Sequence, residues 1–203
     1  MKNQLISIVM PCYNAAATLG QSVNSIIGQS FTNWELLILE DGSSDSTEEI
    51  ASRLALSDPR IKIIYSAVNR GVVRMRNIGI RLAKGDWIAF CDADDWWMPQ
   101  KLEWQMALAE QKNANLIYSA VYYYKESSRI HQKEIQLLPD VCYNDMLKTN
   151  AIPMSTSIYQ IDSLGKHYFN PVSDKLVHED YAYWQQLFKK GKVQSAYVKT
   201  PTT

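Results

Sequence analysis

The stretch "GDWIAFCDADD", residues 85–95, contains a short apolar run and ends in a cluster of three aspartates. The apolar run at residues 87–90 is typical of a short buried strand. Asp92, Asp94 and Asp95 follow it directly, so three carboxylates gather where the predicted strand ends. Like charges this close repel one another, and partial burial adds a desolvation cost. The stretch therefore predicts a strand whose end needs a compensating positive charge.

Upstream of this stretch, short apolar runs alternate with segments of helical spacing. The runs predict three further strands, at residues 5–10, 35–39 and 61–65. Apolar residues spaced three or four apart predict helices between them, at residues 18–29, 47–56 and 72–84. The resulting β-α-β-α-β-α-β order predicts an α/β fold, in which a mostly parallel, Rossmann-like sheet carries helices on both faces.

Polar clusters follow three of the four predicted strands. They are "PCYN" at residues 11–14, "EDGSSDS" at residues 40–46 and "DADD" at residues 92–95. Ligands of open parallel sheets bind beyond the carboxyl ends of the strands, so we expect these clusters to converge on one edge of the sheet. That convergence is stronger evidence for a ligand site than any one of the motifs.

Residues 99–203 show a less regular pattern. Helices are predicted at residues 99–111, 143–148 and 179–189, and strands at residues 115–124, 134–138, 155–159 and 193–198. Pro99 is expected in the first turn of its helix, and Gly191 is expected to end the last helix. The whole chain is expected to form one domain. Because the chain ends at "TPTT", just past the last predicted strand, the sequence leaves open whether the native chain extends beyond Thr203.

Composition excludes several classes of protein. The 203 residues are 46% hydrophobic and carry 21 basic and 21 acidic side chains, so no strong global field attracts nucleic acid. The three cysteines match no zinc motif, and their odd number suits a reducing compartment. No apolar stretch reaches the roughly 18–20 residues that span a bilayer, and no signal peptide is recognisable. These features predict a cytoplasmic location, with the inner face of the membrane left open.

The aspartate cluster has two explanations. A divalent cation, Mg²⁺ or Mn²⁺, would turn the repulsion between Asp92 and Asp94 into coordination, usually with phosphate oxygens as further ligands. Alternatively, the cluster is an Asx turn that caps the helix starting near Pro99. A D-x-D pattern is common, so it does not decide between the two by itself.

The loops after the first two strands are equally ambiguous when taken alone. Tyr13 can stack on a nucleobase, and Asn14 can hydrogen-bond to that base or to its own loop, but both are also ordinary turn residues. Asp41 can accept a hydrogen bond from a base N–H or from a ribose hydroxyl. A plain strand–turn–helix connection explains residues 42–46 well and explains Asp41 less well.

Two later motifs carry further candidates. In "NRGVVRMRNIG", Arg74 and Arg76 lie near a helix start, where they can pair with Asp41 or with phosphate, or simply face solvent. In "HED", Glu179 and Asp180 open a helix, so capping is the plain interpretation and a general base is the functional one.

Taken together, these motifs resemble family 2 glycosyltransferases, which have the GT-A fold. The resemblance rests on "SIVMPCYN", "LILEDGSSDST", "NRGVVRMRNIGI", "GDWIAFCDADDWWMP" and "HEDYAYWQQL", in that order along nearly the whole chain. It implies a nucleotide-sugar donor, often a UDP-sugar, a divalent metal and inversion at the anomeric carbon by single displacement. It also implies that residues 1–98 are the nucleotide-sugar-binding half and residues 99–203 the acceptor-side half.

The resemblance assigns roles by motif position. Asp94 matches the metal-binding aspartate, with Asp92 on the ribose or metal side, and Asp180 matches the catalytic base, with Glu179 beside it. The nucleotide-binding positions are Pro11, Tyr13, Asn14, Asp41, Asn69, Arg76 and Asp92. Of these, Tyr13 matches the residue that stacks on the base and Asp41 the carboxylate that reads it. The roles of Arg76, Asp95 and His178 stay open.

One departure from the family narrows the activity. Processive members carry a Q-x-x-R-W motif and membrane helices, whereas "YWQQLFKKG" has no R-W pair. We therefore expect transfer of one sugar to a carbohydrate or lipid-linked acceptor, as in bacterial capsule or lipopolysaccharide assembly. Two alternatives remain, a sugar-nucleotide pyrophosphorylase and a non-catalytic nucleotide-sugar-binding module. A pyrophosphorylase would be expected to carry a Gly-rich, basic loop after the first strand, and "PCYNAAATLG" has neither the glycines nor a lysine. A non-catalytic binding module would be expected to lose the carboxylates.

Overall fold

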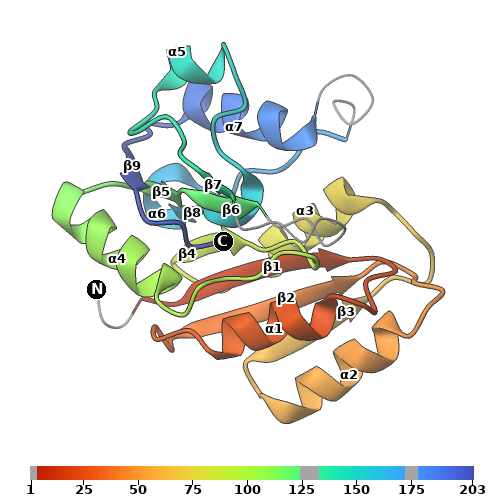
Figure 1. Cartoon of the computed structure of the whole chain (residues 1–203). Coiled ribbons are helices and arrows are strands. Elements are labelled where there is room, and N and C mark those ends of the chain that lie inside the picture. Colours follow the sequence, from red (N-terminus) through yellow and green to blue (C-terminus); the bar gives the residue numbers. More distant parts are fainter. Residues whose placement is uncertain (1–3, 124–132, 172–177) are drawn as a thin grey trace.

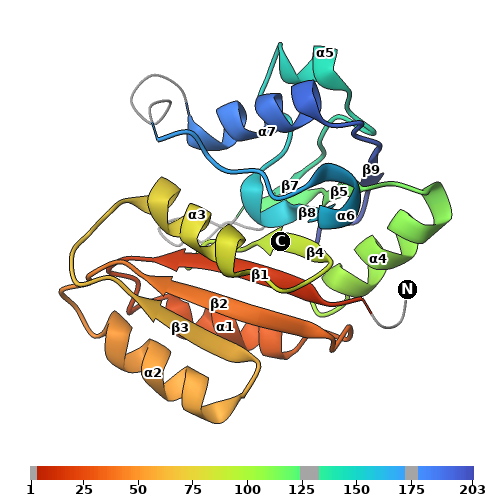
Figure 2. The same cartoon turned by 180° about the vertical axis from the view of Figure 1, so that it is seen from behind.

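The structure is a computed structural model that describes residues 4–123, 133–171 and 178–203 (Figures 1 and 2). The strands are β1 (Ile6–Cys12), β2 (Trp34–Glu40), β3 (Ile61–Tyr65), β4 (Trp87–Phe90), β5 (Leu116–Ser119), β6 (Val121–Tyr123), β7 (Lys133–Ile135), β8 (Ile158–Gln160) and β9 (Ser195–Val198). The helices are α1 (Leu19–Ile27), α2 (Thr47–Ser57), α3 (Val72–Leu82), α4 (Lys101–Lys112), α5 (Tyr143–Met146), α6 (Ile161–Leu164) and α7 (Glu179–Lys190), with the 3₁₀ turn η1 (Met154–Thr156).

Seven strands form one central sheet in the order β3-β2-β1-β4-β8-β5-β9, and β6 pairs with β7 in a small second sheet. All strand pairs are parallel among β1 to β4 and between β5 and β9, whereas β8 runs antiparallel to both of its neighbours. The predicted α/β fold with a mostly parallel sheet is confirmed.

Helices cover both faces of this sheet because the side chains of its strands alternate between two cores. Along β1, Ile6, Ile8 and Met10 belong to the core that also contains α1, α2 and α4, whereas Val9 belongs to the core formed with α3 and α7. Figures 1 and 2 show α1 and α2 below the sheet and α7 above it. The period-two alternation expected of a two-sided strand therefore places each layer of helices.

The first strand runs further than the sequence predicts. A strand was expected at residues 5–10, because Pro11 has no N–H for the ladder, but β1 continues through Pro11 to Cys12. The Cys91 N–H donates to the Val9 carbonyl, so the backbone N–H and C=O groups of the odd-numbered residues of β1 point toward β4. Pairing with β4 stops at Val9. The N–H that Pro11 lacks would point past the end of β4, so its absence costs no ladder hydrogen bond.

In the second half of the chain, two predicted strands differ from the observed elements by more than a shift of their ends. Residues 115–124 were expected to form one strand, but β5 and β6 separate at Ala120, and Tyr124 lies outside the described residues. Ala120 instead hydrogen-bonds through its N–H to Val198 and through its carbonyl to Thr202. Residues 155–159 were expected to be a strand, but η1 comes first and β8 follows, because Thr156 and Ser157 hydroxyls bond back to the carbonyls of the preceding turn.

Other helix ends differ by small shifts. The helix α4 begins at Lys101, so Pro99 precedes it rather than lying in its first turn. Gly191 ends α7 as expected, and its N–H bonds to the Leu187 carbonyl. The one-turn helix α6 was not predicted, because a single turn leaves no periodic signal.

Within the parts of the chain that the structure describes, no helix combines the length and apolar character needed to cross a bilayer.

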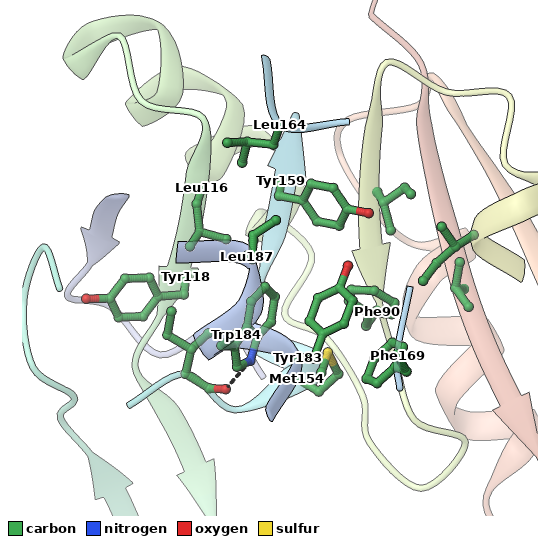
Figure 3. Packing of buried hydrophobic residues seen from close by; sticks show 14 of the residues in the cluster. Phe90, Leu116, Tyr118, Met154, Tyr159, Leu164, Phe169, Tyr183, Trp184 and Leu187 are labelled. Carbon is green, nitrogen blue, oxygen red and sulfur yellow. Dashed lines mark hydrogen bonds between the residues drawn. The ribbon is translucent and has the colours of Figure 1, made fainter. Parts of the chain in front are cut away.

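Aromatic side chains attach α7 to the sheet (Figure 3). Phe90, at the end of β4, makes edge contacts with Phe169, Tyr183 and Trp184 at ring separations of 5.9, 5.7 and 6.4 Å. The indole N–H of Trp184 donates to the carbonyl of Ile152 at 2.8 Å. Full burial of each large side chain contributes roughly 1.5–3 kcal/mol. This cluster fixes where the first turn of α7 stands relative to the end of β4.

Candidate functional site

A pocket of about 550 Å³ opens at the carboxyl ends of β1, β2 and β4. Its lining includes every residue predicted to bind nucleotide or metal, namely Pro11, Tyr13, Asn14, Asp41, Asn69, Arg76, Asp92 and Asp94. The predicted convergence of the three strand-end loops on one edge is therefore confirmed as geometry. Glu179 and Asp180 do not belong to the lining, although Glu179 contacts one lining residue, Arg76.

The loop after β1 presents Tyr13 and folds Asn14 back. Tyr13 is 50% exposed, so its ring is available at the pocket wall. Asn14 has a φ of +48°, a left-handed conformation that asparagine tolerates. Its N–H donates to the Ser43 hydroxyl, and its side-chain oxygen accepts from the Ser44 N–H at 2.9 Å. Asn14 thus joins the first two loops, whereas a bond within its own loop was the expected alternative to a bond with the base.

Asp41 is buried and shapes the loop that leads into α3. Its two oxygens accept the backbone N–H groups of Arg70 at 2.7 Å and Gly71 at 2.8 Å. The alternative in which Asp41 pairs with the side chain of Arg74 or Arg76 is wrong, since Asp41 accepts backbone amides and Arg76 pairs with Asp92 and Glu179. Each oxygen has a second lone pair, so the group retains accepting capacity toward the pocket.

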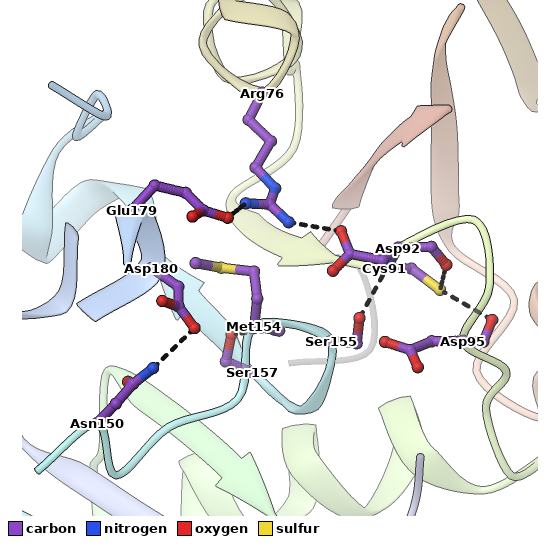
Figure 4. Close-up of polar contacts among 10 residues, drawn as sticks. All are labelled: Arg76, Cys91, Asp92, Asp95, Asn150, Met154, Ser155, Ser157, Glu179 and Asp180. Carbon is purple, nitrogen blue, oxygen red and sulfur yellow. Dashed lines mark hydrogen bonds and ion pairs between the residues drawn. The ribbon is translucent and has the colours of Figure 1, made fainter. Parts of the chain in front are cut away.

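Arg76 connects the pocket to α7 (Figure 4). One terminal nitrogen of its guanidinium lies 2.6 Å from Asp92 Oδ1, and the other lies 3.0 Å from Glu179 Oε1. The Arg76 side chain is only 4% exposed. Burial lowers the pKa of Arg76, but the charges of Asp92 and Glu179 outweigh that effect and raise it above its usual value. The compensating charge that the aspartate cluster needs is therefore in part a buried arginine.

The three aspartates do not point the same way. Asp92 and Asp94 line the pocket, whereas Asp95 does not belong to its lining and is partly buried. Burial raises the pKa of Asp95 to about 6, and the charges of Asp92 and Asp94 add to the effect. The alternative that this cluster caps the following helix is wrong, since the residue before α4 is Gln100 and it makes no side-chain cap.

The pocket carboxylates fit a divalent cation. Asp92 and Asp94 are two residues apart on one loop and supply the oxygen ligands that Mg²⁺ and Mn²⁺ prefer. Among the residues the structure describes, no group of three or more His, Cys, Asp or Glu side chains gathers for a metal. Two carboxylates with phosphate oxygens completing the shell are the usual arrangement for Mg²⁺ bound together with a nucleotide.

The segment at residues 155–156 forms hydrogen bonds to the aspartate loop and to the residues that follow it. The sequence analysis did not predict this contact. The Ser155 hydroxyl accepts the Asp92 N–H at 3.0 Å, and the Ser155 carbonyl accepts the indole N–H of Trp97 at 3.0 Å. The Thr156 carbonyl accepts from Lys101 Nζ, which is fully buried. These partners are more than fifty residues apart in sequence, so no local pattern reveals them.

At the start of α7, Glu179 and Asp180 have different partners. Glu179 faces Arg76, whereas Asp180 Oδ2 accepts from the side-chain amide of Asn150 at 2.8 Å (Figure 4). Asp180 Oδ1 accepts the Tyr181 N–H at 2.7 Å. His178 precedes the helix and makes no side-chain cap. Asn150, which the sequence did not single out, is the neighbour that orients Asp180.

Comparisons with known proteins agree with this architecture. The model of the family described as glycosyl transferase family 2 matches residues 7–170. A curated relative from Escherichia coli, the UDP-Glc:α-D-GlcNAc-diphosphoundecaprenol β-1,3-glucosyltransferase WfgD, is 33% identical over 196 residues, which cover 96% of this chain and 74% of WfgD.

Solved structures show the same fold at low sequence identity. TarS 1–349 of S. aureus in complex with UDP superimposes with a TM-score of 0.80 at 18% identity, over 97% of this chain. The mannosyltransferase PcManGT of Pyrobaculum calidifontis in complex with GDP-Man and Mn²⁺ gives a TM-score of 0.70 at 16% identity, over 98% of this chain. The chain spans 59% of the TarS structure and 55% of PcManGT, so these likenesses establish the GT-A-type fold alone.

Proposed function

The chain belongs to glycosyl transferase family 2, and from that premise we propose that it transfers one sugar from a UDP-sugar to the hydroxyl of an acceptor. The observation that carries the proposal is the single pocket that joins Tyr13 and Asp41 from the first two loops to Asp92 and Asp94 from the third. An exposed aromatic ring, a hydrogen-bond acceptor and paired carboxylates are the groups that a base, a ribose and a metal-bound diphosphate require.

Each residue has a defined part in the proposed reaction. Tyr13 stacks on the base, and Asp41 accepts hydrogen bonds from the nucleoside. Asp92 and Asp94 hold Mg²⁺ or Mn²⁺, which when bound supplies Lewis-acid stabilisation of the leaving diphosphate. Asp180 accepts the proton of the acceptor hydroxyl while that oxygen bonds to the anomeric carbon from the face opposite the diphosphate. The bond from that carbon to the diphosphate breaks, UDP leaves with the electron pair, and the configuration inverts.

The acceptor is proposed by likeness to WfgD, whose name specifies a GlcNAc-diphosphoundecaprenol acceptor. We place the activity in bacterial cell-surface polysaccharide synthesis, with a lipid-linked sugar as acceptor and the inner face of the membrane as its location. The acceptor is expected on the side of the pocket formed by α7 and the loop carrying Asn150, because Asp180 lies there.

The proposal is tested by measuring UDP release from a panel of UDP-sugars with Mn²⁺, in the presence and absence of a short-chain GlcNAc-diphospholipid acceptor. Acceptor-dependent release from the wild type, and its loss in Asp94→Asn, is the expected result. Tight UDP binding without release from any donor, with or without the acceptor, would instead identify a non-catalytic binding module. GDP-mannose, with released GDP measured, serves as the control donor, since PcManGT is seen with that nucleotide sugar.

Metal dependence has a separate test. Calorimetry of UDP binding is compared with Mn²⁺ and with EDTA, for the wild type and for Asp94→Ala. Affinity that rises with Mn²⁺ in the wild type only supports coordination through Asp94. Equal UDP affinity with Mn²⁺ and with EDTA in the wild type contradicts it.

A further inference from the structure

Arg76 is the buried cation that links the two halves of the site. Asp92, at the end of β4, is 16 residues from it in sequence, and Glu179, the first residue of α7, is 103 residues away. Taking a guanidinium out of water costs several kcal/mol, which two well-placed carboxylates offset. Such a group adds little net stability compared with apolar packing, so its position in the site calls for another explanation.

A second contact from the same turn of α3 joins it to α7 through Phe169. The Asn77 side chain donates to the Phe169 carbonyl at 2.9 Å and accepts the Phe169 N–H at 2.7 Å. The Phe169 ring stacks on Tyr183 of α7 at 4.1 Å, and the Arg76 guanidinium carbon lies 5.4 Å from the centre of the Phe169 ring. The α3 helix therefore reaches the first half of α7 through an ion pair and through an aromatic stack.

Glu179 and Asp180 are adjacent, but their surroundings differ in charge. Glu179 Oε1 faces a permanently charged guanidinium, whereas Asp180 has a neutral amide and a backbone N–H as partners. A carboxylate loses its negative charge when it accepts a proton, and this weakens any ion pair that it forms. If Glu179 accepted the proton during turnover, its ion pair with Arg76 would break. Among the residues that the structure describes, Asp180 has no ion-pair partner to lose, and its carboxylate lies in the same helical turn.

We propose that Arg76 is a positioning residue that holds Glu179, and with it the first turn of α7, against Asp92, so that Asp180 stands at a fixed distance from the donor. Glu179 is then a positioning residue too, and it takes no proton from the acceptor. This inference rests on the proposed function, because Asp180 is the base in both. A displacement of about 1 Å in such a constellation can lower turnover by roughly 10²-fold, which gives the expected scale of the effect.

The test compares Glu179→Gln with Glu179→Ala. Glutamine keeps an oxygen that accepts from Arg76, so turnover of the UDP-sugar is expected within about threefold of the wild type. Alanine removes the contact, and turnover is expected to fall by about 10- to 100-fold, while the affinity for UDP with Mn²⁺ changes by less than about twofold. If Glu179 were the base, glutamine would be as inactive as alanine, and that result overturns the proposal.

Hydrogen exchange supplies a readout that does not depend on activity. In Glu179→Ala, exchange is expected to speed up at residues 181–184 of α7 and to stay unchanged at residues 187–190. Uniformly faster exchange along α7, or no change at all, contradicts local positioning. A wild type that neither binds UDP nor releases it from any donor would refute the proposed function, and the exchange comparison would still decide whether Arg76 positions α7.

Arg76→Lys is the partner variant, since it keeps the charge but lacks the two-pronged geometry. It is expected to lose as much turnover as Glu179→Ala, and the double variant is expected to lose no more than either single one, because both break the same link. If the losses of turnover multiply in the double variant, Arg76 and Glu179 act independently, and that result overturns the proposal. Where Arg76→Lys does not fold by circular dichroism, the Glu179 pair alone decides the outcome.

Discussion

The two halves of this chain hold their site residues by different means. In residues 4–98, the pocket residues stand at the ends of parallel strands, and short loops between adjacent elements place them. In residues 99–203, Asp180 stands at a helix start whose position depends on an aromatic cluster and on Arg76 from the other half. A repeated βα pattern builds the pocket by topology, whereas the start of α7 needs contacts between distant parts of the chain.

The largest expected effect comes from Asp180→Asn, which separates the two halves by function. Asparagine keeps the size and the acceptor oxygen but cannot take a proton, so turnover should fall by roughly 10²–10⁴-fold. Because Asp180 lies outside the donor pocket lining, UDP affinity with Mn²⁺ should not change. Steady-state transfer and calorimetry on the same preparation check this. Near-normal transfer by a variant that has only lost stability would leave Asp180 as a helix-start residue.

The next effect concerns the packing that places α7. Trp184→Ala removes a fully buried indole and its bond to Ile152, and should cost about 3–5 kcal/mol of unfolding free energy. Trp184→Phe is the control that keeps part of the packing and should cost clearly less. Denaturant unfolding followed by circular dichroism measures both. A loss below about 1 kcal/mol for the alanine variant would show that the second half does not depend on this cluster.

A smaller effect is expected at the donor side. Tyr13→Ala should weaken UDP binding by about 10- to 100-fold, because stacking on a base is worth roughly 1–3 kcal/mol. Tyr13→Phe retains the ring and should bind UDP almost normally. Half-exposed Tyr13 contributes little to packing, so the melting temperature should hardly change in either variant. Equal UDP affinity in the wild type and the alanine variant would place the base elsewhere in the pocket.

The smallest expected effect is a pH dependence at the boundary between the halves. Burial lowers the pKa of Lys101 from its ordinary value of 10.5 to about 7, although its ammonium donates to Gln105 and Thr156. Between these pH values the unfolded chain holds a proton that the folded chain lacks. The free energy of unfolding should therefore rise with pH above 7, by at most about 1.4 kcal/mol per pH unit.

The measurement is denaturant unfolding at pH 7.0 and 8.5, for the wild type and for Lys101→Met. The buried cysteines set the highest pH of the measurement. Burial raises the pKa of Cys12 to about 12 and also raises that of Cys91. At higher pH these thiols lower the free energy of unfolding and so oppose the rise that Lys101 causes. The methionine variant should show a smaller rise than the wild type. The same slope in both proteins would mean that Lys101 keeps its proton in the folded state.

Particular residues show how far the sequence could be used. Periodicity predicted the seven elements of residues 5–90 nearly to their ends, because the periods of strands and helices are contained in short stretches of sequence. It failed at residues 115–124, where the C-terminal residues pair with Ala120 and divide the expected strand. It also could not reveal Ser155 or Asn150, whose partners Asp92 and Asp180 are 63 and 30 residues away.

The sequence by itself determined the α/β fold, the edge of the sheet where the polar loops meet and the family to which the chain belongs. These follow from local patterns, since strand and helix periods and strand-end motifs are written over short distances. Only the tertiary structure decided that Asp95 turns inward, that Asp41 holds backbone amides and that Arg76 pairs with Asp92 and Glu179. Side-chain direction and ion pairing depend on which distant groups share the same buried space, and a linear pattern does not carry that information.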